Sequence, residues 1–133
     1  MQCLFLPLPA YLTGEAVYAT ITGVQSTGVQ ACAKHFVGNQ QESFRYSESS
    51  DIDQRTLQEK YLYPFQRAVD AGVACVMCSY NRINGTYACE NPALIGETGL
   101  LKGQLGFEGY VVSDWGATHG FAPGTSAAGL DVE

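Results

Sequence analysis

Residues 109–117, GYVVSDWGA, combine an apolar run with an aspartate and a tryptophan that follow it directly. A short apolar run bounded by glycine is typical of a strand that is buried on both faces, as in a parallel sheet. Asp114 then stands at the tip of that strand, where an unpaired carboxylate would cost desolvation free energy. Most strand-ending aspartates are turn or N-cap residues, so a functional role for Asp114 needs support from the rest of the chain.

Two other segments, residues 30–40 and 73–82, share this pattern of an apolar run that ends in polar residues. Helical patterns separate the three segments, which predicts an α/β fold with about three parallel strands and flanking helices. Ligands bind at the carboxyl ends of the strands in such sheets. We therefore expect three polar tips to lie on one face: Lys34-His35, Ser79-Tyr80-Asn81 and Ser113-Asp114-Trp115.

Helices are expected over residues 13–26, from Asp51 onward, and within residues 97–105. Thr13 is the predicted N-cap of the first helix, and an aspartate is the predicted cap of the second. Pro64 falls inside the apolar stripe of the second helix and should kink it or split it in two. The polar segment 39–50 is expected to be a loop at the strand ends.

The composition argues against several classes of binding partner. Seven Lys and Arg residues against 13 Asp and Glu give a net charge of −6, and no basic stripe is present. Nucleic acid and anionic membranes are therefore not expected as partners. No apolar stretch approaches the length of a membrane span. Residues 1–10, MQCLFLPLPA, form an atypical apolar start that lacks a positively charged leader and is not a convincing signal peptide.

Five cysteines are present. Cys75 and Cys78 have the C-x-x-C spacing, but they lie in a strand-like run and lack a second ligand pair, so no metal site is predicted. Cys32 and Cys75 are expected to be free and buried. Cys78 and Cys89 flank a turn-rich stretch and could form a disulfide in an oxidising compartment. Residues 84–86 form an N-x-T sequon, which makes Asn84 a candidate for glycosylation.

Asp, Lys, His, Tyr and Trp side chains around one opening are the types that a sugar site uses. The carboxylate could attack the anomeric carbon as a nucleophile. Each residue could instead have a purely structural role. Lys34 could be a strand-end lysine that extends into solvent, His35 a histidine whose hydrogen bonds are made within the fold, and Tyr80 a residue of the hydrophobic core. Ser113 lies near Asp114 and His119 in sequence but lacks a G-x-S-x-G elbow, which argues against acyl transfer. No phosphate loop or dinucleotide motif is present, so no cofactor is expected.

Three blocks, ACAKHFVGNQQE, CSYNRINGTYACENPAL and LLKGQLGFEGYVVSDWGATH, resemble successive blocks of the glycoside hydrolase family 3 β-glucosidases, particularly those of the fungal type. The resemblance covers residues 11–133. It implies a (β/α)₈ TIM-type barrel followed, in the family, by an α/β sandwich domain. It also implies that Asp114 is the retaining nucleophile, that Lys34, His35 and Tyr80 bind the sugar, and that Trp115 is the aromatic residue beside the nucleophile.

A whole barrel takes roughly 250 residues, so residues 11–133 are expected to be a fragment of the barrel domain, or a partial (β/α)₈ barrel. The family's acid/base residue comes from the following domain and has no match here. We expect a β-glucosidase-type hydrolase for terminal non-reducing β-D-glucosyl residues, such as those of cello-oligosaccharides. Its partners would be the missing barrel strands and the sandwich domain. The alternative is a truncated, inert product with at most weak sugar binding. The resemblance implies an extracellular location.

Overall fold

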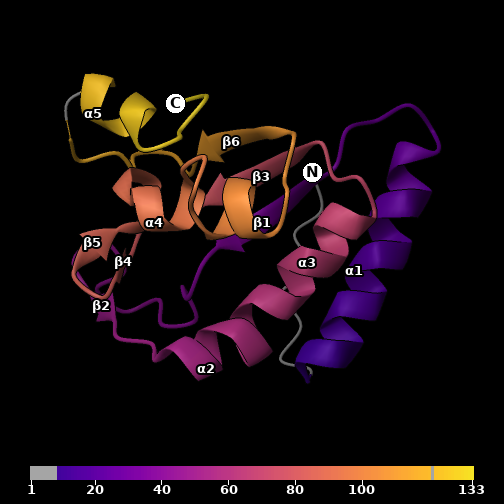
Figure 1. Ribbon diagram of the computed structural model, residues 1–133, viewed down its shortest axis with the longest axis horizontal. Coiled ribbons are helices and arrows are strands. Elements are labelled where there is room, and N and C mark those ends of the chain that lie inside the picture. The colour runs from indigo at the N-terminus through magenta and orange to yellow at the C-terminus, as the bar shows by residue number, and fades with distance from the viewer. Residues whose placement is uncertain (1–8, 121) are drawn as a thin grey trace.

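The computed structural model describes residues 9–120 and 122–133, and its centre is a three-stranded parallel sheet (Figure 1). The strands are β1 (Cys32–Phe36), β3 (Cys75–Cys78) and β6 (Tyr110–Ser113), in the order β1-β3-β6. Each strand lies inside one of the three predicted segments, so the α/β prediction is confirmed. The expectation for residues 1–10 falls largely on residues 1–8, which lie outside the described residues.

The pairing of β1 with β3 contains one irregularity. Cys32 pairs with Cys75 and Lys34 pairs with Met77, but the next pair is Phe36 with Cys78. His35 is therefore an extra residue, and the register shift there is a β-bulge. Bulges bend a strand locally and redirect a side chain, and they are common beside active sites.

Helices α1 (Ala10–Gln25) and α3 (Tyr63–Asp70) lie side by side along one flank of the sheet (Figure 1). The Arg67 guanidinium of α3 donates to the Glu15 carboxylate of α1, with an Nε–Oε1 distance of 2.8 Å. The prediction that Thr13 caps the first helix is wrong. The helix begins after Pro9, and the Thr13 amide already donates to the Pro9 carbonyl as an interior residue would.

The second predicted helix is divided into three parts. The Asp53 carboxylate caps α2 (Gln54–Thr56) by accepting from the Thr56 amide at 3.0 Å. A π-helical segment, η1 (Leu57–Leu62), follows and leads into α3, which has Pro64 in its first turn. Proline has no N–H to donate to the preceding turn, and a wider π turn accommodates it. Leu62 and Tyr63 keep α-helical dihedral angles, so the helix continues through Pro64 and is not split there; a kink at Pro64 stays a prediction.

Shorter helical segments follow β3. The helix predicted within residues 97–105 is a single π-helical segment, η3 (Leu100–Gln104). A short helix that the sequence reading missed, α4 (Pro92–Ile95), begins at Asn91, whose side chain accepts from the Ala93 amide. The remaining two are η2 (Ala88–Glu90) and α5 (Ala122–Ala127). Within residues 9–120 and 122–133, no helix has the length and apolarity that crossing a bilayer requires.

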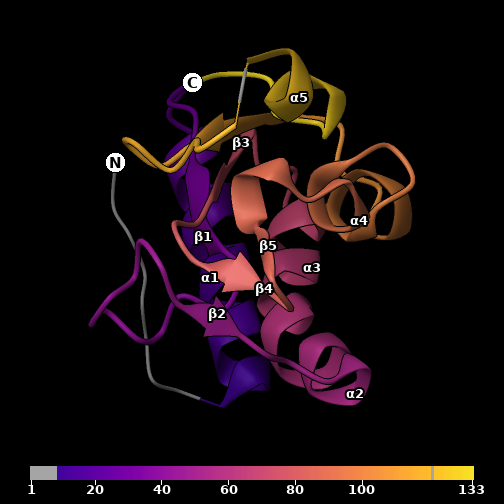
Figure 2. The same cartoon turned by 90° about the vertical axis from the view of Figure 1, so that its left-hand side faces the viewer.

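A second, smaller sheet lies beside the first (Figure 2). It consists of β2 (Ser49–Ser50), β4 (Arg82–Ile83) and β5 (Thr86–Tyr87). Asn84 and Gly85 join β4 to β5 with φ angles of 49° and 90°, the left-handed conformation that a two-residue hairpin turn of type I′ requires. The Asn-Gly pair is a strong hairpin signal that the sequence reading did not use.

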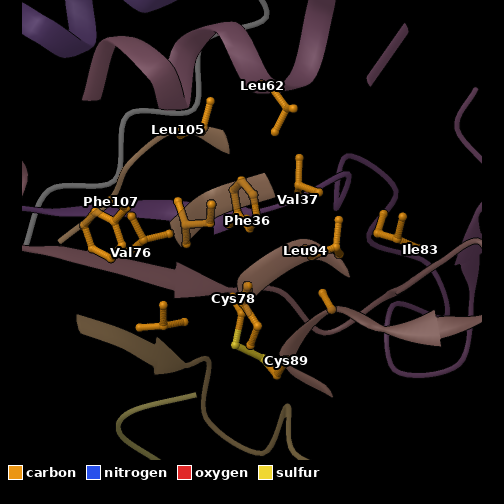
Figure 3. Close-up of a cluster of buried hydrophobic side chains, with 14 of the residues drawn as sticks. Phe36, Val37, Leu62, Val76, Cys78, Ile83, Cys89, Leu94, Leu105 and Phe107 are labelled. Atoms are coloured by element: carbon orange, nitrogen blue, oxygen red, sulfur yellow. A yellow bond between two sulfur atoms is a disulfide. The ribbon is translucent and has the colours of Figure 1, made fainter. Parts of the chain in front are cut away.

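The hydrophobic core lies between the parallel sheet and the helices (Figure 3). Phe36 and Val76 extend from β1 and β3 and are fully buried, and Leu62 and Leu105 pack on the same cluster. Burying a large apolar side chain contributes roughly 1.5–3 kcal/mol, so this cluster is the main source of stability for the segment.

Two disulfides connect the sheet to itself and to the following loop. Cys78 and Cys89 are bonded with Cα atoms 5.2 Å apart, which is the pairing that the sequence suggested (Figure 3). Cys32 and Cys75 are also bonded, with a Cα separation of 4.3 Å, so the expectation that both are free is wrong. They are register partners on neighbouring strands, and strand register is not readable from either segment alone.

At the amino ends of the strands, one side chain satisfies several backbone groups. The Gln25 side-chain oxygen accepts from the amides of Ala31 and Ala74, which precede β1 and β3. Its amide nitrogen donates to the Gly72 carbonyl at 2.8 Å. Gln25, the last residue of α1, therefore joins the helix to the start of two strands.

Candidate active site

The carboxyl ends of β1, β3 and β6 bring the predicted polar tips together. Asp114 follows β6 directly and is only 6% exposed. Its amide donates to the Cys78 carbonyl, which extends the β3–β6 pairing by one bond. The Ala117 amide donates to the Asp114 carbonyl and closes a turn. The backbone of Asp114 is thus fixed by the sheet on one side and by a turn on the other.

The Asp114 carboxylate has a donor on each oxygen. His35 Nε2 lies 3.0 Å from Oδ2, and the Trp115 amide donates to Oδ1 at 2.9 Å. A buried carboxylate costs free energy unless hydrogen-bond donors compensate it. One donor here is a side chain of β1, and the other is the backbone amide of the residue after Asp114. The bulge at His35 supplies one, and the turn after Asp114 supplies the other.

His35 is held in its neutral form. Burial lowers its pKa, the Lys34 charge lowers it further, and the attraction of Asp114 only partly opposes these effects. A neutral imidazole can donate a hydrogen bond from Nε2–H to the Asp114 carboxylate.

Tyr80 follows β3 and completes the group. Its hydroxyl donates to the Trp115 carbonyl at 2.9 Å, and its side chain is almost fully buried. Burial, the Asp114 charge and a hydrogen bond with Asp114 raise the pKa of Tyr80 to about 12. The phenol therefore remains protonated beside the carboxylate and donates its proton to the Trp115 carbonyl.

Lys34 and Trp115 lie at an open cavity of about 1260 Å³ that also reaches His35. Lys34 pairs with Met77 across the sheet, and its charge acts on His35. The Trp115 side chain is 71% exposed, so its ring is free to contact a ligand. An aromatic face, a cation and the imidazole that contacts Asp114 line one opening, and these groups suit a polyhydroxylated ligand.

Asn84 and two glutamates lie at the edges of this region. Asn84 is exposed in the β4–β5 turn, where its side chain exchanges two hydrogen bonds with the backbone of Ile52. Glu42 is paired with Arg45, and the Glu90 carboxylate accepts from the backbone amides of His119 and Gly120. Within the described part of the chain, no three metal-ligating side chains gather into a possible metal site.

The sequence reading missed Arg45. Its guanidinium carbon lies 4.4 Å from the centroid of the Tyr80 ring, in the polar loop between β1 and β2. The only available signal was a cation between two aromatic residues, Phe44 and Tyr46, and it gave no indication of which strand end the loop approaches.

Comparison with known proteins places this geometry in a family. Residues 9–128 match the glycosyl hydrolase family 3 N-terminal domain. The chain belongs to glycosyl hydrolase family 3. "Probable beta-glucosidase L" of Emericella nidulans is 56% identical over 122 residues, which are 92% of this chain and 16% of that protein. The family 3 chain thus spans about a sixth of the length of this relative.

Solved structures agree with the fold. The crystal structure of β-glucosidase D2-BGL from Chaetomella raphigera is 57% identical and superposes with a TM-score of 0.88, over 93% of this chain and 17% of that one. A Kluyveromyces marxianus β-glucosidase in complex with glucose is 35% identical, with the same TM-score, over 93% of this chain and 15% of that one. The parallel sheet and helices of the family 3 chain are part of a TIM-type barrel.

Proposed function

We propose that this chain carries the nucleophile and part of the sugar subsite of a retaining β-glucosidase. Asp114 is the proposed nucleophile, and the proposed substrate is a terminal non-reducing β-D-glucosyl residue, as in cellobiose or a cello-oligosaccharide. The observation that carries the proposal is the buried Asp114 carboxylate, held by His35 and the Trp115 amide beside an open cavity. The names of the relatives support the substrate class.

In the proposed reaction, one Asp114 oxygen attacks the anomeric carbon of the glucosyl unit. The bond to the leaving oxygen breaks, that oxygen takes a proton from an acid, and a glycosyl ester forms on Asp114. Water, deprotonated by the same group, then releases glucose and restores the carboxylate. Lys34 would donate to a sugar hydroxyl, Nδ1 of His35 and the Tyr80 oxygen would accept from sugar hydroxyls, and Trp115 would pack against the ring.

The acid must lie roughly 5 Å from the nucleophile in a retaining site. Of three candidate glutamates in this chain, Glu42 and Glu90 are engaged with Arg45 and with backbone amides. The third, Glu48, has one buried oxygen without a partner. We propose that the acid comes from outside this chain, from the α/β sandwich domain that the family resemblance implies.

We further propose an extracellular location. The two disulfides fit an oxidising compartment, because cytosolic thiols are normally kept reduced. The exposed sequon asparagine, Asn84, would accept a glycan there.

The test uses a graft that carries residues 9–133 of this chain in place of the matching segment of the Chaetomella raphigera β-glucosidase. A slow fluoroglucoside with a dinitrophenolate leaving group should inactivate the graft and leave its sugar on Asp114, located by peptide mass spectrometry. A label on any other residue, or a graft that does not release nitrophenol from an aryl β-glucoside, contradicts the proposal.

The second candidate, an inert chain, applies to the 133 residues by themselves. Within the described residues, β1 pairs only with β3, and the cavity beside it is open. We expect no glucosidase turnover and a broad thermal transition, because open edges and an uncovered inner face weaken cooperativity. A sharp transition in a soluble monomer would contradict this expectation.

A further inference from the structure

The loop between β1 and β2 returns over the candidate site through Arg45. The Arg45 guanidinium carbon lies 4.4 Å from the centre of the Tyr80 ring and 5.1 Å from that of Tyr46. The two tyrosine rings are themselves 4.7 Å apart and inclined by 60°. A cation at this distance from an aromatic face is attracted to it, and the attraction grows as water is excluded.

Arg45 is itself anchored by its hydrogen bonds. Its Nη1 donates to Glu42 Oε2 at 2.9 Å, and its Nη2 donates to the Tyr46 hydroxyl at 3.2 Å. The other Glu42 oxygen accepts from the side chain of Asn39, which is almost fully buried. A planar guanidinium can make these two bonds at its edge while its flat face stays over a ring, which an ammonium group cannot do.

The anchored ring carries the hydroxyl that faces the nucleophile. Tyr80 donates to the Trp115 carbonyl, and Trp115 in turn donates its amide to Asp114. A small rotation of the Tyr80 ring would move the hydroxyl away from both groups. Arg45 and Tyr46 lie against the ring, whereas the turn at Asp114 and Trp115 receives the hydroxyl, so the side chain is held at both ends.

We propose that Arg45 is a positioning residue that fixes the Tyr80 hydroxyl beside Asp114 and thereby contributes to turnover without touching the sugar. This inference rests on the proposed function, because it assigns Arg45 a part in the same reaction. Misplacing a group by a fraction of an ångström near the reacting atoms lowers the rate more than it lowers substrate affinity.

The test is a double-mutant cycle in the graft, with an aryl β-glucoside as substrate. Arg45→Met keeps the side-chain stem and removes the guanidinium, and we expect kcat to fall between about 2-fold and 30-fold with little change in KM. In the Tyr80→Phe background there is no hydroxyl to place, so the same change should cost less than about 2-fold. Arg45→Lys should not restore the rate, since it keeps the charge but not the plane.

Arg55→Met is the matched control, because among the described residues Arg55 forms an exposed ion pair with Glu59, four residues further along the chain. It should leave kcat unchanged. An Arg45→Met loss of equal size in both Tyr80 backgrounds overturns the inference, and so does no loss in either. These results require a graft that hydrolyses the substrate. A graft without turnover overturns the proposed function first, and the inference with it.

Discussion

The two ends of the parallel sheet are held together in different ways. At the amino ends, Gln25 binds three backbone groups, and the Cys32–Cys75 disulfide joins neighbouring strands. At the carboxyl ends, side chains such as His35 and Asp114 bond to one another. In barrels of this kind, the first end serves stability and the second serves chemistry. Substitutions at the two ends should therefore change different measured quantities.

The largest effect is expected for Asp114→Asn in the graft. Asparagine keeps the shape but has no anionic oxygen to attack, so kcat should fall at least about a thousandfold. The apparent melting temperature should change little, because Oδ1 of the asparagine can still accept from the Trp115 amide, and its Nδ2 can donate to His35 Nε2 once the neutral imidazole carries its proton on Nδ1. A melting temperature that falls as steeply as the rate would show that this end also carries the stability of the fold.

The two disulfides should separate stability from activity. Removing Cys32–Cys75 by alanine substitution should cost about 1 kcal/mol more unfolding free energy than removing Cys78–Cys89, because the closed segments have sequence separations of 43 and 11. The second removal itself should cost on the order of 2–3 kcal/mol. Removing Cys78–Cys89 should lower turnover more than removing Cys32–Cys75, since the loop that Cys78 and Cys89 close contains Tyr80. Guanidinium unfolding and aryl glucoside hydrolysis of the two grafts test both statements, and the reverse order in both would contradict them.

Gln25→Ala should lower stability and spare turnover. It leaves two amides and a carbonyl without their partner, and because these groups are half-buried or exposed, each lost hydrogen bond costs about 0.5–1.5 kcal/mol. We expect a melting temperature lower by about 2–4 °C or more in thermal scans of the graft. Gln66→Ala is the control, because among the described residues the Gln66 side chain donates to Asp70 of the same helix. A fall in kcat with unchanged melting would contradict the division of the sheet ends.

The smallest effect is expected from pH. The pKa of His35 lies below its ordinary value of 6.5 because of burial and the Lys34 charge. As the pH falls below 6.5, the unfolded chain binds more protons than the folded one. The contribution of neutral His35 to the free energy of unfolding is therefore present above pH 6.5 and is lost as the pH falls through the folded pKa. His35→Gln should flatten the decline of stability in acid, and His119→Gln should not. The free energy of unfolding of the parent graft and of both variants is measured by denaturant titration at several pH values. An equally steep decline with falling pH in all three proteins would show that His35 is not the cause.

Much of this arrangement could be predicted from the sequence. The three strands and the convergence of Lys34, His35, Tyr80 and Asp114 at one end follow from apolar runs that end in polar residues. The pairing of Cys32 with Cys75 did not follow, because it depends on the register between strands far apart in sequence. The start of α1 was misplaced for a local reason: Thr13 resembles a cap, but the backbone is already helical from Ala10.

The contact between His35 and Asp114 could not be predicted either. Topology places both residues at the same edge, but a regular strand gives no reason for the imidazole to reach the carboxylate. The register shift at His35 is a property of the β1–β3 pairing, and no residue type in the segment marks it. Arg45 was missed for a related reason, since the path of a polar loop is set by what it packs against.

The extra residue at His35 also determines which sequence changes this strand can survive. Substitutions at Ala33 or Phe36 alter packing by degrees and can be offset by neighbouring residues. A deletion of one residue from β1 would instead restore an unbroken ladder with β3 and remove the irregularity that presents the imidazole to Asp114. In an alignment, this strand should therefore tolerate exchanges of side chains while keeping its length. A family member with a shorter β1 would have to supply the donor to its aspartate from somewhere else.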